Sequence, residues 1–109
     1  MATILDDKSF DDCLKSQKPF VVKFFSLWDS SSRSLEDIFK EIADEFSGKA
    51  KFMQSNMNSN PELAEKCHIT KVPTIAVFSS GKVVMRITSF PSKRALKEQM
   101  ENIFRSLSQ

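Results

Sequence analysis

The stretch VVKFFSLWDSSSR, residues 21–33, joins an apolar run to a polar hexapeptide. The run begins after Pro19 and is rich in β-branched and aromatic residues, which is typical of a buried strand. The hexapeptide WDSSSR, residues 28–33, then leads into a strongly patterned helical segment, yet it holds an aspartate, three serines and no cysteine. A junction suited to presenting a reactive group therefore presents side chains of low intrinsic reactivity.

The segments on either side of this junction have helical signals. Residues 34–46 predict a helix, with Gly48 as its stop, and six apolar residues recur there at helical spacing: Leu35, Ile38, Phe39, Ile42, Ala43 and Phe46. Before the strand, Ser9 is placed to cap a short helix over 10–17. After it, residues 51–57 are a weaker strand candidate, and Asn60 followed by Pro61 predicts a short helix to about Cys67.

The last third of the chain predicts a hairpin and a helix. VPTIAVF, residues 72–78, is a strand candidate with a proline near its start, and the turn around Gly81 connects it to KVVMRIT, residues 82–88. Ser92 then precedes an amphipathic helix over 93–107. Because helices alternate with strands before this hairpin, the order predicts an α/β layer structure with a mixed sheet, as one domain over residues 1–109.

Bulk properties narrow the class of protein. A net charge of +2 in 109 residues is too small to argue for a nucleic-acid partner. Neither a signal peptide nor a run long enough to cross a membrane is recognisable, and the two cysteines, Cys13 and Cys67, suit a reducing compartment. We therefore expect a cytoplasmic protein without a nucleic-acid or membrane partner. No Cys/His spacing predicts a metal site.

Residues 21–33 and the segment SNPELAEKCHITKVPTIAVFSSGKVV, residues 59–84, together with the order of elements, resemble the thioredoxin family. The similarity runs from about Ile4 to Leu107. It rests most on Trp28, the Asn60-Pro61 helix start, Val72-Pro73-Thr74 and Gly81. The resemblance implies the thioredoxin fold: a central mixed β-sheet flanked by helices on both faces, with a cis peptide bond before Pro73.

The sequence departs from the family where the family performs its chemistry. Aligning Trp28 with the family's tryptophan places Asp29, Ser30, Ser31 and Ser32 on its Cys-Gly-Pro-Cys motif. Lys23 falls on a buried aspartate that in the family assists the second thiol. Because a carboxylate and a hydroxyl cannot exchange disulfides, we expect no dithiol–disulfide oxidoreductase activity, no catalytic residue and no cofactor.

Two roles are open for Asp29. It can cap the helix that follows, which is the simpler interpretation, or it can pair with Lys23, a residue that strand alternation places on the same face as Val21 and Phe25. A serine hydrolase is not expected, because His68 is the one histidine and the resemblance places it after the short helix.

These observations leave two functional hypotheses. In the first, the chain is a redox-inactive module, a monomer or weak dimer, that binds a protein or an extended peptide. The resemblance places its binding residues at Trp28, Val72, Pro73, Thr74 and Phe90. In the second, it is a weak thioredoxin-type oxidoreductase that works through Cys67, alone or with Cys13 of another chain.

Overall fold

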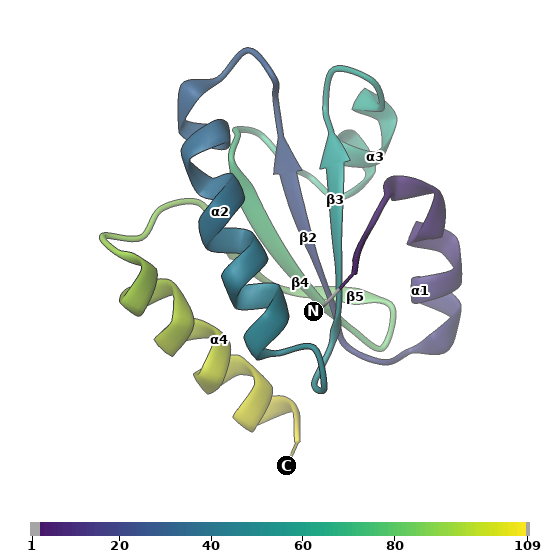
Figure 1. The fold of residues 1–109 in the computed structure, drawn as a ribbon. Helices are drawn as coiled ribbons and strands as arrows, with labels where there is room; N and C mark the ends of the chain where they lie inside the picture. Colours follow the sequence, from purple (N-terminus) through teal and green to yellow (C-terminus); the bar gives the residue numbers. More distant parts are fainter. Residues whose placement is uncertain (1–2, 109) are drawn as a thin grey trace.

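A five-stranded mixed sheet forms the centre of the computed structural model, which describes residues 3–108 and all of their side chains except those of Ser32 and Arg33 (Figure 1). Its strands, in the spatial order β1-β3-β2-β4-β5, are β1 (Ile4–Leu5), β3 (Lys51–Asn56), β2 (Phe20–Phe25), β4 (Thr74–Ser79) and β5 (Lys82–Ile87). The first three run parallel to one another, whereas β4 is antiparallel to β2 and β5 to β4.

Helices cover both faces of this sheet (Figure 1). They are the 3₁₀ helix η1 (Asp7–Ser9) and the α-helices α1 (Phe10–Ser16), α2 (Ser30–Glu45), α3 (Pro61–Lys66) and α4 (Lys93–Leu107). The long helices α2 and α4 lie on one face, and the short helices α1 and α3 lie toward the other. The predicted fold class, an α/β thioredoxin fold with a mixed sheet, is confirmed.

The sheet separates two hydrophobic cores, because side chains alternate along β2. Val21 packs with α2 and α4, while Phe20, Val22 and Phe24 pack on the side of α1 and α3. On that second side the ring of Phe20 stacks on the ring of Phe78 at 4.4 Å between centroids. The long apolar run read from the sequence is therefore a strand buried on both faces.

Several details differ from the sequence expectations. β2 ends at Phe25 rather than at Leu27, and β4 begins at Thr74 rather than at Val72. The two-residue strand β1 was not predicted, and α2 begins at Ser30 rather than at residue 34. Ser9 occupies the N-cap position of α1, but its side chain makes no capping hydrogen bond. Because η1 already coils the chain before α1, Ser9 has helical rather than extended dihedral angles, and Asp6 provides the cap one element earlier.

The strand register brings several connections to one end of the sheet. Phe24 at the end of β2 lies opposite Thr74 at the start of β4, and Ile75 lies opposite Ile87 at the end of β5. Phe25 lies beside Asn56 at the end of β3. The β2–α2, α3–β4 and β5–α4 connections therefore share that end, and the Val72–Pro73 peptide bond there is cis. Within residues 3–108, no helix is both long and apolar enough to span a bilayer.

Candidate functional site

The β2–α2 connection is held in a turn by Ser26. Its hydroxyl donates to Oδ1 of Asn58 at 2.9 Å and accepts from the backbone N–H of Trp28 at 3.2 Å. The backbone carbonyl of Ser26 also accepts from the N–H of Asp29 at 3.3 Å. These contacts tie the connection to the end of β3 and fix the two residues between Ser26 and Asp29 on the outside of the turn.

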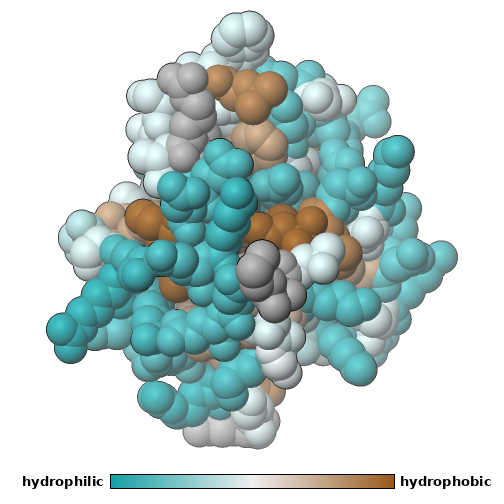
Figure 2. Space-filling view, in the orientation of Figure 1, coloured by the Kyte–Doolittle hydropathy of each residue, from teal (hydrophilic) through white to brown (hydrophobic). Residues whose placement is uncertain are grey.

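Those two residues, Leu27 and Trp28, are exposed. The exposed fraction is 84% for Trp28 and 58% for Leu27. Large apolar side chains held out of the core in this way are typical of surfaces that meet a partner. Figure 2 shows hydrophobic atoms at the surface at the top of the view, the end of the molecule where β2 leads into α2. Trp28 therefore does not serve the packing of the core.

Asp29 caps α2. Its Oδ1 accepts from the backbone N–H of Ser31 at 2.8 Å, which satisfies one of the free donors at the start of the helix. Ser30 and Ser31 are exposed on the first turn of α2, whereas the side chain of Ser32 lies outside the described part of the structure. The capping role of Asp29 is confirmed.

His68 follows α3 and lines a hollow on the α1 and α3 side of the sheet.

Lys23 is buried at an exposed fraction of 2%, on the α2 face of β2. Its Nζ lies 5.2 Å from the ring centroids of both Phe25 and Phe39, within the range of a cation–π contact. Burial lowers the pKa of Lys23, and Glu36 opposes that shift only in part. Among the described side chains, none forms an ion pair with Lys23. The hypothesis that Asp29 pairs with Lys23 is wrong, because Asp29 turns to its own helix instead.

The segment before β4 has its own internal anchor. The hydroxyl of Thr74 donates to the backbone carbonyl of Lys71 at 2.6 Å, and its side chain is buried. Val72 and Pro73 are partly exposed. Phe90 is half-buried against the core on the α2 and α4 side. Val72 and Pro73 are therefore partly open to solvent, whereas the side chain of Thr74 is buried and holds the shape of this segment.

Neither cysteine is placed for thiol chemistry. Cys13 and Cys67 are buried as free thiols in the core on the α1 and α3 side. Burial raises the pKa of both, and this outweighs the opposite effect of Lys51 on Cys13 and of Arg86 and Lys66 on Cys67. A raised pKa and a buried sulfur both reduce the supply of reactive thiolate.

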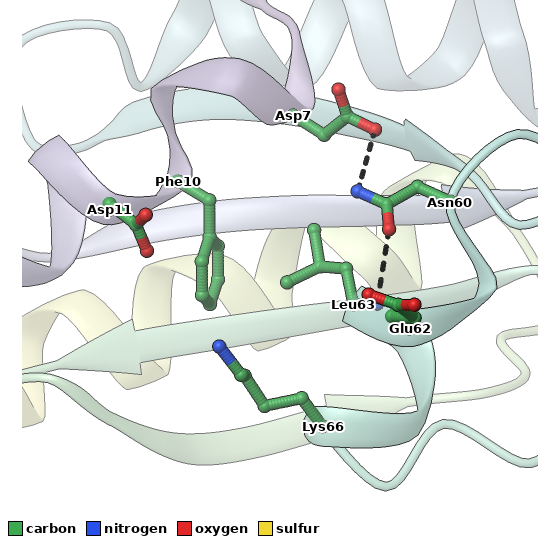
Figure 3. A pocket seen from close by; sticks show the side chains of 7 residues that line it. All are labelled: Asp7, Phe10, Asp11, Asn60, Glu62, Leu63 and Lys66. Carbon is green, nitrogen blue, oxygen red and sulfur yellow. Dashed lines mark hydrogen bonds between the residues drawn. The ribbon is translucent and has the colours of Figure 1, made fainter.

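A hollow of about 190 Å³ lies away from this site, between η1, α1 and α3 (Figure 3). The side chain of Asn60 donates to Oδ2 of Asp7 at 3.2 Å and accepts from the N–H of Leu63 at 3.3 Å. Asp11 and Glu62 also line the hollow. No group of three or more potential ligands able to hold a metal ion exists among the described residues. The two hydrogen bonds of Asn60 in this hollow connect the start of α3 to η1.

The mixed sheet with helices on both faces, and the exposed tryptophan just before a long helix, are consistent with a thioredoxin-fold protein. The family model described as Thioredoxin matches residues 1–102. A thioredoxin of Rickettsia bellii is 34% identical over 103 residues, covering 94% of this chain and 98% of that protein. A thioredoxin of Staphylococcus saprophyticus is 30% identical over 95 residues, covering 87% and 90%. The chain belongs to the thioredoxin family.

A further relative is longer. The bifunctional thioredoxin reductase/thioredoxin of Mycobacterium leprae is 28% identical over 105 residues, which covers 96% of this chain but 23% of that protein.

Sequence reasoning missed three residues of this site. Leu27 belonged to the apolar run and was assigned to the strand, but β2 ends at Phe25. Ser26 and Asn58 carried no motif, and their side-chain hydrogen bond joins residues 32 positions apart. One signal was present in the sequence: a serine that interrupts the apolar run where the strand ends.

Proposed function

We propose that the chain is a redox-inactive thioredoxin-like module that binds a protein or an extended peptide in the groove around Trp28 and Val72-Pro73. The observation that carries this proposal is the exposure of Trp28, at 84%, beside the exposed Leu27. A lone large apolar side chain held in solvent has little structural value, but it provides the rigid contact area of an interface.

Chemistry argues against disulfide exchange at this site. That reaction requires a thiolate to attack a sulfur and a second thiol to resolve the mixed disulfide. Asp29, Ser30, Ser31 and Ser32 offer oxygen alone, and the carboxylate of Asp29 is engaged in capping α2. Cys13 and Cys67 are both buried, so neither thiol is exposed at this site.

The proposed mode of binding is strand addition. An extended segment would pair with the backbone before Pro73, at Val72, while its apolar side chains pack on Trp28 and Leu27. Ser26 fixes the turn that presents Trp28, and the hydroxyl of Thr74 fixes the segment that presents Val72. Because both halves of the groove are already shaped, little ordering cost is added on binding.

A capture experiment tests this proposal. The chain and a Trp28→Ala, Val72→Asp variant are used to pull partners from a lysate, and captured partners are then titrated in purified form. We expect the variant to lose binding by about thirtyfold or more, since a hot-spot aromatic residue carries roughly 2 kcal/mol or more. Lys49→Ala, which shortens an exposed side chain in the turn between α2 and β3, is the control and should bind normally. If a captured partner binds all three proteins with equal affinity, it does not bind in the groove around Trp28.

The rate at which dithiothreitol reduces the disulfides of insulin, measured with and without the chain, tests whether the chain has redox activity. The chain should not accelerate insulin reduction above the rate with dithiothreitol alone, and Cys67→Ser should change nothing. Acceleration that disappears in Cys67→Ser would establish the oxidoreductase alternative instead.

A further inference from the structure

A second hollow lies on the opposite side of the sheet from α2, between α1, the end of α3 and the edge strand β5. Its volume is about 340 Å³. Its apolar lining comes from Phe10, Leu14, Phe78 and Val83. This volume and lining suit one or two apolar side chains of a partner.

Three cationic side chains line this hollow, and one of them, Lys66, also lines the neighbouring hollow that holds Asp7, Asp11 and Glu62. The three are Lys66, Lys82 and Arg86, and none of them forms an ion pair with a carboxylate among the described residues. The guanidinium of Arg86 is fixed in place, because its Nε and Nη2 donate to the carbonyl of Cys67 at 3.3 and 3.1 Å. On the other face of the sheet, by contrast, Lys93 and Lys97 pair with Glu41 and Glu45.

The strand that borders the hollow is open on its outer side. Within residues 3–108, β5 is the last strand of the sheet, so no strand of this described part pairs with the backbone groups that point away from β4. Val84 on this strand is 43% exposed. Cations on an edge strand disfavour pairing with a basic strand, and the same cations favour an acidic one.

We propose that β5 and the adjoining hollow form a second binding surface, which takes an acidic extended peptide segment that alternates carboxylates with apolar residues. The segment adds as a sixth strand along β5. Its apolar side chains enter the hollow over Phe78 and Val83, and its carboxylates meet Lys66, Lys82 and Arg86. This surface is separate from the groove at Trp28, so it does not depend on the function proposed for that groove.

The probe for this surface is a blocked heptapeptide of sequence EVEFEVE, with QVQFQVQ and KVKFKVK as neutral and basic counterparts. Amide NMR titration of the full chain locates binding, and hydrogen exchange shows whether a strand has been added. We expect EVEFEVE to shift the amide signals of β5 and α3 and to protect the outward-facing amides of β5. The neutral peptide should bind more weakly and the basic peptide should not bind.

Matched variants test the charge of the surface. Lys66→Gln with Lys82→Gln should weaken EVEFEVE binding by about tenfold, as expected for the loss of two partly exposed charge pairs. Lys49→Gln with Arg105→Gln removes the same net charge at positions that do not line the hollow and should leave the affinity unchanged.

Other outcomes overturn the proposal. Shifts confined to Trp28 and Val72 would place the peptide in the other groove, and shifts without protection of β5 would exclude strand addition. Equal losses in the two double variants would indicate nonspecific attraction. Concentration-dependent dimerisation without peptide binding would assign the edge to a second copy of the chain.

Discussion

At the scale of single residues, the β2–α2 junction contains two charges with unrelated roles. Asp29 satisfies the first turn of α2, and Lys23 lies beneath it between two aromatic rings. The sequence predicted the cap and the face of the strand on which Lys23 lies. It could not predict what the lysine contacts, because alternation fixes the direction of a side chain but not the partner at its tip.

Lys23→Met should stabilise the protein. A buried amine without a carboxylate partner costs about 1–3 kcal/mol, and methionine fills a similar volume without this cost. Because burial lowers the pKa of Lys23, the folded state binds fewer protons than the unfolded state. The penalty is full below the folded pKa and disappears as pH rises toward the ordinary lysine value of 10.5.

Urea unfolding followed by circular dichroism, at pH 7 and at intervals toward pH 10.5, measures this effect. The gap between Lys23→Met and the parent should be largest at neutral pH and narrow with rising pH. Lys15→Met, at an exposed position on α1, is the control and should show no such trend. A destabilised Lys23→Met would mean that the contacts with Phe25 and Phe39 outweigh the cost of burial.

At the scale of elements, the helix starts show how far local signals extend. Ser92 and Asn60 cap α4 and α3 as predicted, because each stands in an irregular segment with its side chain free to turn back on the helix. Ser9 does not cap, because η1 precedes it directly. The two residues of β1 are too few to produce a pattern, and their strand exists through its pairing with β3.

Besides capping α3, Asn60 donates a hydrogen bond to Asp7, a contact that the local sequence does not predict. Substitutions can separate the effects of the cap and of this hydrogen bond. Asn60→Ala removes both the cap of α3 and the hydrogen bond to Asp7, and it should lower the free energy of unfolding by about 1–2 kcal/mol. Asn60→Asp keeps an acceptor for the N–H of Leu63 but places a carboxylate beside that of Asp7. The destabilisation caused by Asn60→Asp should therefore decrease at high salt concentration, which screens the repulsion between the two carboxylates.

Thermal unfolding of the three proteins at low and at high salt concentration makes this comparison. Asp7→Asn combined with Asn60→Asp is the compensating control, because it restores a donor and an acceptor across the same contact. If the double variant is no more stable than Asn60→Asp, the contact between η1 and α3 has no energetic role.

At the scale of the whole molecule, the sheet separates the two surfaces that we propose for binding. The groove around Trp28 lies at one end of the sheet, and the cationic hollow lies on the face of α1 and α3. The fold followed from the order of elements and their apolar patterns. The hollow could not be predicted in this way, because Phe10, Phe78 and Arg86 are far apart in sequence and meet only when α1 packs across the edge of the sheet.

The labelling rates of the two buried thiols show which part of the structure opens first. Cys13 and Cys67 belong to the same core, so a thiol reagent should label both more than about a hundredfold more slowly in the native protein than in urea. Cys67 should be the faster, because it also lines the hollow beside β5. Single Cys→Ala variants, labelled over time and read by mass, separate the two rates. Faster labelling of Cys13 would mean that α1 detaches before the edge of the sheet opens.

The position of Trp28 also decides what optical spectroscopy can detect. The chain has one tryptophan and no tyrosine, and its indole is in water in the native state. Its fluorescence should therefore already resemble that of the denatured chain and change little on unfolding. Desolvation of the indole by a ligand should instead shift the emission to the blue, so this natural fluorophore reports occupancy of the groove and is nearly silent about folding.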